Sequence, residues 1–187
     1  MGIAHDLADS IGSALESARA GNEKLASRYL NLGGLPRLAV VSSAFKDGAV
    51  LPKRCTADGE GTPPDLQWTG APEGTRSFVV LCEDPDAPAL KPFVHWLAYG
   101  IPAETGTLDD QAASRALLGK NSNRKLGFTG AAPPPGHGVH HYHFQVFALD
   151  VTPELEPGIG RSTLLDTLRD HVLAWGELVG TYERRGG

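Results

Sequence analysis

The chain has 187 residues, of which 41% are hydrophobic and 21% charged, and its formal net charge is −5. This length and composition are typical of a single globular domain. The acidic balance argues against binding to nucleic acid and against docking on an anionic membrane, because both depend on Lys and Arg. The two cysteines, Cys55 and Cys82, do not have the number or spacing of a disulfide framework. No apolar run reaches the roughly 18 residues of a membrane helix, and the N-terminus lacks the pattern of a signal peptide. We therefore expect a cytoplasmic protein.

The first 35 residues are predicted to form an N-terminal helical extension, and residues 36–187 to form the main domain. Apolar side chains recur at helical spacing near the N-terminus, at Ile3, Leu7, Ile11, Leu15 and Ala18. Asn22 is expected to cap a second short helix over residues 23–32, which Gly33 and Gly34 would end. The extension is interpreted as a helical appendage packed on the domain, and a dimerisation arm or a lid is the alternative.

The main domain is predicted to be mainly β. Apolar and β-branched segments bounded by Gly, Pro and Asp are typical of strands, and they cover residues 37–45, the start of 66–75, 77–84, 93–102 and 139–150. Residues 103–136 are expected to be mostly irregular. Residues 161–178 are predicted to begin as a helix capped by Ser162 or Thr163, with Leu164, Leu165, Leu168 and Val172 on one face, and residues 177–184 to form a final strand. Short strands joined by long Gly- and Pro-rich loops favour a β sandwich with peripheral helices.

Two polar segments adjoin the apolar strands at residues 77–84 and 93–102. Asp84 and Asp86 lie in a loop stiffened by Pro85 and Pro88, which could hold both carboxylates in position at low entropic cost; a turn with solvated carboxylates is the alternative. His95 is expected to share one strand face with Phe93, Leu97 and Tyr99, opposite Val94, Trp96 and Ala98. If Asp84 lies beside His95, it would fix the ring tautomer and leave the second nitrogen for a ligand. A histidine satisfied within the core is the alternative.

A third polar segment holds four of the seven histidines, between His137 and His143. Three prolines at 133–135 stiffen the loop before it, and a glycine on each side of His137 allows close approach of the backbone to a ligand. Strand alternation places His140 and Tyr142 on one face and His141 and His143 on the other. The pattern therefore argues against a metal site built from all four histidines.

The three segments, in this order, resemble the phosphatidylethanolamine-binding protein family, and more narrowly its bacterial branch of Raf kinase inhibitor-like proteins. The resemblance is carried by Asp84-Pro85-Asp86-Ala87-Pro88, His95-Trp96, and Pro133-Pro134-Pro135-Gly136-His137-Gly138 followed by His140-x-Tyr142. Residues 63–78 also fit the strand and turn that precede the first motif, and the whole match covers about residues 40–185.

The resemblance implies a large antiparallel sheet packed on a smaller one, helices towards the C-terminus, and a small anion pocket for phosphate-like groups. The pocket would be lined by Asp84, Asp86, His95, Ala132, Pro134, His140 and Tyr142. The sequence departs from the family at two places: His141 stands where Arg is usual, and Ala131-Ala132 stands where Gly-Pro is usual. Both departures bear on ligand preference.

Two carboxylates repel an anion, so we expect them to stand behind the histidines. Asp84 would orient His95 or His140 and stabilise its charged form, and a spare carboxylate would suit the ammonium of a phosphoethanolamine-like ligand. The principal hypothesis is a binding protein for a phosphate-like anion or a phospholipid head group that regulates a kinase or protease partner by inhibiting it. It predicts no catalytic residue, cofactor or metal.

Two other functions stay open. One is a hydrolase that uses an Asp–His acid/base pair but lacks an evident nucleophile, and the other is a metal site of His95, His140 and one Asp. A homodimer formed through the N-terminal helices is also an open alternative.

Overall fold

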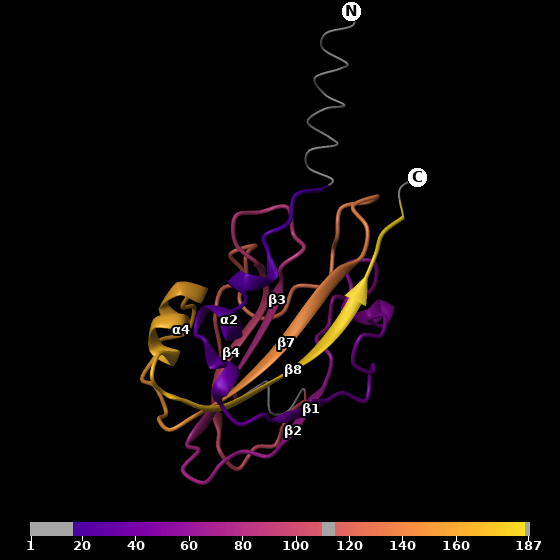
Figure 1. Ribbon diagram of the computed structural model, residues 1–187. Helices are drawn as coiled ribbons and strands as arrows, with labels where there is room; N and C mark the ends of the chain where they lie inside the picture. Colours follow the sequence, from indigo (N-terminus) through magenta and orange to yellow (C-terminus); the bar gives the residue numbers. More distant parts are fainter. Residues whose placement is uncertain (1–16, 110–114, 186–187) are drawn as a thin grey trace, which may run out of the picture.

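The structure is a computed structural model that describes residues 17–109 and 115–185. Its strands form two sheets, in which every strand pair is antiparallel (Figure 1). The larger sheet has the order β6-β4-β3-β7-β8 and the smaller one the order β1-β2-β5. The larger sheet consists of β3 (Ser77–Asp84), β4 (Phe93–Pro102), β6 (Leu117–Leu118), β7 (His140–Leu149) and β8 (Val172–Tyr182). The smaller sheet consists of β1 (Ala39–Val41), β2 (Leu66–Thr69) and β5 (Thr107–Leu108). The predicted mainly β fold, with a large sheet packed on a smaller one, is confirmed.

The central strand, β3, is buried along all eight of its residues. Its alternate side chains enter two apolar layers. Phe78 and Val80 face the smaller sheet and pack with residues such as Trp68. Val79 and Leu81 face the opposite side, which is covered by helices α2 (Ala26–Tyr29) and α4 (Arg161–Leu168). Because both faces of β3 are covered, the strand is a nearly continuous apolar run.

The N-terminal segment differs from its prediction. Most of the first predicted helix, residues 3–16, lies outside the described residues. The second is broken into the 3-10 turn η1 (Asn22–Lys24), α2, and the 3-10 turn η2 (Leu32–Gly34). The helix restarts at Ala26 because the side chains of Glu83 and Gln145 accept hydrogen bonds from the N–H groups of Ala26 and Ser27, at 2.8 and 3.0 Å. The larger sheet thus caps α2, and Asn22 does not.

The helix predicted to begin at residue 161 is correct only in its first half. It ends at Leu168 and is preceded by Gly160, without a side-chain cap from Ser162 or Thr163. Asp170 then adopts a left-handed conformation with a φ of 68°, and Val172 starts β8 instead of extending the helix. Pairing of β8 along the whole of β7 outweighs the local helical periodicity. The predicted final strand is present but begins at Val172 rather than at residue 177.

Gly176 marks the point where the chain before β1 crosses β8. A Cβ at this position would overlap the carbonyl oxygen of Leu38 and lie 2.8 Å from Cγ2 of Val40. The backbone of Leu38 cannot easily retreat, because its N–H donates to the carbonyl of Trp175 at 2.9 Å. We expect Gly176→Ala to lower the free energy of unfolding by about 1–3 kcal/mol in a urea titration. The control is Gly34→Ala, where nothing lies within 4 Å of the new Cβ, and equal losses in the two variants would contradict the prediction.

The connecting segments include the 3-10 turn η3 (Lys53–Cys55). Within the two described stretches, no helix has both the length and the apolar character needed to cross a membrane.

Candidate functional site

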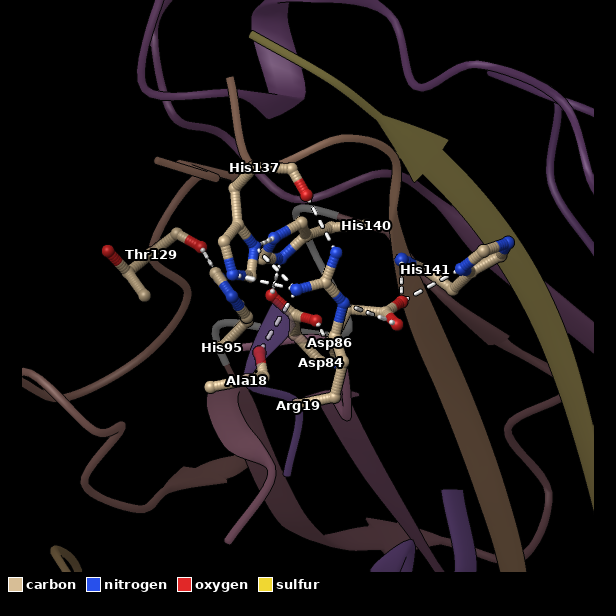
Figure 2. Close-up of polar contacts among 9 residues, drawn as sticks. All are labelled: Ala18, Arg19, Asp84, Asp86, His95, Thr129, His137, His140 and His141. Carbon is tan, nitrogen blue, oxygen red and sulfur yellow. Dashed lines mark hydrogen bonds and ion pairs between the residues drawn. The ribbon is translucent and has the colours of Figure 1, made fainter. Parts of the chain in front are cut away.

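A cluster of polar side chains lies at one end of the three central strands, β4, β3 and β7 (Figure 2). Asp84 ends β3, His95 lies near the start of β4 and His140 begins β7. Neighbouring strands run antiparallel, so the end of β3 meets the starts of β4 and β7. The three residues are only 3%, 4% and 1% exposed, respectively. The structure therefore brings together the residues that the sequence placed in three separate segments.

A β-bulge in β4 aims His95 at this cluster. Cys82 pairs with Trp96, but the next residue, Glu83, pairs with Val94, so that His95 is the extra residue in β4. Such a bulge re-aims a side chain relative to strict alternation. The sequence placed Val94 on the same strand face as Trp96 and Ala98, and this prediction is wrong. Val94 packs in the helix-covered layer, whereas Trp96 faces the smaller sheet.

The bulge turns the ring of His95 towards Tyr142 and away from the face that carries Leu97 and Tyr99. The two rings meet edge to face, with their centres 5.0 Å apart. Nδ1 of His95 lies 2.8 Å from the carbonyl oxygen of Thr129, to which it donates as N–H, leaving Nε2 as an acceptor. The tautomer is therefore set by a backbone carbonyl, and not by Asp84 as expected.

Burial lowers the pKa of His95, although the Thr129 carbonyl and the charge of Asp84 oppose the shift. A lowered pKa means that the ring is neutral at neutral pH. Asp84 was expected to orient His95 or His140, and at His95 desolvation outweighs the carboxylate.

Asp84 is bound instead to His140, at the start of a chain of hydrogen bonds. Nδ1 of His140 is 2.7 Å from Oδ2 of Asp84, and Nε2 of His140 is 2.7 Å from Nδ1 of His137. Nη1 of Arg19 lies 2.7 Å from Nε2 of His137 and 3.0 Å from its Nδ1. One proton for each contact gives a single direction: Arg19 donates to His137, His137 to His140, and His140 to Asp84. The chain of contacts therefore runs from the guanidinium of Arg19 to the carboxylate of Asp84.

Asp86 is not the spare carboxylate that the sequence suggested. Its Oδ2 accepts from the backbone N–H of His141 and contacts Nδ1 of the same residue, both at 2.8 Å. Its Oδ1 lies 3.5 Å from Nε of Arg19. The N–H of Asp86 in turn donates to Oδ1 of Asp84 at 2.8 Å, so the loop closes as an Asx turn. Both oxygens of Asp86 therefore face donors supplied by the protein itself.

Tyr142 contributes a buried hydroxyl to the site. The residue is 1% exposed, and among the described residues its hydroxyl has no hydrogen-bond partner. Burial, followed by the charge of Asp84, raises the pKa of Tyr142, so the group keeps its proton. An unpaired buried hydroxyl costs about 1–3 kcal/mol, and a ligand that accepts its proton would recover that free energy.

The two remaining predicted residues, Ala132 and Pro134, lie in the loop before β7 and are exposed. Pro134 acts through its backbone: its carbonyl accepts the N–H of His137 at 3.1 Å and shapes the turn that presents this ring. Two residues that the sequence did not select, His137 and Arg19, complete the cluster. The flanking glycines were a signal for His137, whereas Arg19 lies outside the family resemblance and gave none.

The alternative of a metal site gains no geometric support. Over the described residues, no group of three or more His, Cys, Asp or Glu side chains is arranged to hold a metal ion. The ring nitrogens of His140 contact Asp84 and His137, and Nδ1 of His95 contacts a carbonyl oxygen.

By its fold and site, the chain is an antiparallel two-sheet β sandwich with a buried cluster of carboxylate, imidazole and phenol groups at one end of its central strands. The family model described as phosphatidylethanolamine-binding protein matches residues 41–183. A UPF0098 protein of Pyrococcus horikoshii is 39% identical over 163 residues, which are 82% of this chain and 81% of the relative. This chain belongs to the phosphatidylethanolamine-binding protein family.

Two solved structures agree with the assignment. A putative phosphatidylethanolamine-binding protein homologue from Chlamydia trachomatis is similar with a TM-score of 0.74 and 32% identity, covering 79% of this chain and 98% of that one. YbcL of E. coli, described as a new member of the mammalian family, gives a TM-score of 0.74 and 31% identity, covering 80% and 99%.

Proposed function

We propose that the cluster binds a small phosphate-like oxyanion, either free or as the phosphate of a phospholipid head group. The observation that carries the proposal is the buried hydroxyl of Tyr142, which needs an acceptor, beside the imidazole chain of His137 and His140. Both oxygens of the Asp84 carboxylate already accept hydrogen bonds, one from His140 and the other from the N–H of Asp86. The hydroxyl of Tyr142 is thus a donor left to meet a ligand, and a donor paired with an oxyanion forms a strong hydrogen bond.

Anion binding at this cluster is expected to take up a proton. Before binding, each ring nitrogen of His137 and His140 already has a partner. One added proton turns the facing pair, Nδ1 of His137 and Nε2 of His140, into two donors that repel each other. An oxyanion between them would accept from both rings. Binding and protonation then favour each other.

Calorimetric titration with sulfate between pH 5 and pH 8 tests the proposal, because the charge of sulfate is constant over this range. If one proton accompanies each anion, we expect the affinity to fall by up to about tenfold per pH unit as the pH rises. Inorganic phosphate serves as a second probe. An affinity that stays flat between pH 5 and pH 8 would rule out recognition by protonated imidazoles.

The hydrolase alternative finds little support in this geometry. Asp84, His140 and His137 have the order of a general-base chain, but such a chain needs a nucleophile beside it. Cys82 is fully buried, and burial raises the pKa of its thiol well above the ordinary value. A thiol in this state is inert.

A further inference from the structure

We infer that Arg19 determines which phosphate compounds the pocket accepts. Its guanidinium forms an ion pair with the carboxylate of Asp86, which is then not available to the ammonium of a ligand. The site therefore selects a simple phosphate monoester over a zwitterion such as phosphoethanolamine. This inference rests on the proposed anion-binding function and adds to it the class of ligand.

Arg19 is held at the pocket by the segment of residues 17–21, here named the strap. The N–H of Ala20 donates to the carbonyl of Ala87 at 3.0 Å, and the N–H of Gly21 donates to the carbonyl of Pro85 at 2.9 Å. Ala20 is only 1% exposed. Two backbone hydrogen bonds thus fix the strap along the loop that carries Asp84 and Asp86.

The guanidinium of Arg19 lies between a carboxylate and an imidazole (Figure 2). Its Nη2 donates to the carbonyl of His137 at 2.7 Å, and its Nη1 donates to the carbonyl of Ala18 at 3.0 Å besides contacting the His137 ring. Its Nε faces Oδ1 of Asp86 at 3.5 Å. The side chains of Arg19 and Asp86 are 31% and 20% exposed, respectively, so this pair lies at the solvent side of a cluster whose other residues include the buried Asp84 and His140.

Charge explains why Arg19 affects the preference. A second cation, Arg184, also acts on Tyr142, but its guanidinium is paired with Asp58. Without Arg19, the carboxylates of Asp84 and Asp86 would be faced by the imidazoles of His95, His137, His140 and His141. Two carboxylates close together suit an ammonium group. With Arg19 present, an ammonium near Asp86 would meet a guanidinium. At an effective dielectric constant of about 20, two unit charges about 4 Å apart interact by about 4 kcal/mol. Repulsion by the positive charge of Arg19 is therefore large enough to disfavour a ligand with an ammonium group.

The test uses two ligands that differ only in the ammonium group, ethyl phosphate and phosphoethanolamine. Their association constants are measured by calorimetry at pH 7, where the phosphate of each is mainly dianionic. We expect the wild-type protein to bind ethyl phosphate at least about tenfold more tightly, and Arg19→Gln to shift the ratio of the two constants by about tenfold or more towards phosphoethanolamine. The ratio cancels any general change in access that a loosened strap causes, because such a change affects both ligands.

Two further variants complete the design. Arg28→Gln makes the same change in net charge at an exposed position on α2, and should leave the ratio unchanged. Arg19→Lys keeps the charge and should stay near the wild-type ratio, so a lysine variant that behaves like Arg19→Gln would overturn the argument from charge.

If Arg19→Gln binds both ligands with the wild-type ratio, the inference fails while the proposed function stands. If the wild-type protein binds neither these ligands nor sulfate, the proposed function fails first.

Discussion

Replacement of Glu83 by glutamine is expected to lower the free energy of unfolding by about 3–5 kcal/mol, since removing one partner of a buried ion pair leaves the other charge uncompensated. Glu83 lies in the central strand β3 and is 0% exposed. One of its oxygens binds Nε of Arg161 at the start of α4. The other accepts the N–H of Ala26 at 2.8 Å and the side-chain amide of Gln145 at 2.7 Å. This carboxylate therefore links β3 to α4, to α2 and to the neighbouring strand β7.

Urea titration of Glu83→Gln against the wild-type protein measures the loss. The matched control is Glu60→Gln, the same change at an exposed position in a loop, where we expect a difference within about 0.5 kcal/mol. A loss of less than about 1 kcal/mol for Glu83→Gln would show that Arg161 does not depend on this carboxylate.

The second large effect is expected on binding. His140→Ala should weaken sulfate binding by about 10- to 100-fold, because a hydrogen bond to a charged group contributes about 1.5–3 kcal/mol. It should also reduce the fall in affinity with rising pH, because the ring pair that shares the added proton is lost. Calorimetry at several pH values measures both effects.

The control for this variant is another histidine of the same strand. His143 lies on the opposite face of β7, where its Nδ1 contacts Glu177 at 3.1 Å. His143→Ala should leave both the affinity for sulfate and its pH dependence unchanged. Wild-type binding by His140→Ala, or weakened binding by His143→Ala, would contradict the assignment of the site to this face.

Much of the larger sheet could be predicted because its strands carry their own signals. Residues 77–84 and 93–102 are apolar runs bounded by turn residues, and the bounds of β3 and β4 agree with the prediction residue for residue. The start of β8 could not be predicted, because residues 172–176 continue a helical pattern and become a strand only by pairing with β7. A local sequence pattern predicts an element correctly where local interactions also determine the structure of that element.

The same distinction holds for the candidate site. Asp84, His95, His140 and Tyr142 come together as the motifs suggested, although their role in binding stays a proposal. The bulge that turns His95 results from pairing between β3 and β4, and alternation along one strand cannot reveal it. The contact of Arg19 with His137 joins positions 118 residues apart. Only the folded chain brings such residues together.

The place of β7 between β3 and β8 also has a consequence for synthesis on the ribosome. The hairpin of β3 and β4 can pair as soon as both strands have emerged, whereas the other edge of β3 waits for residues 140–149. Until then, the backbone of a strand apolar on both faces is open to other chains, and unpaired edges of this kind are prone to aggregate. The cluster around Asp84 is also incomplete until then, since Arg19 must wait for His137 and Asp84 for His140. A ribosome that stalls between β4 and β7 would therefore release a chain without the site and with its most hydrophobic edge unprotected.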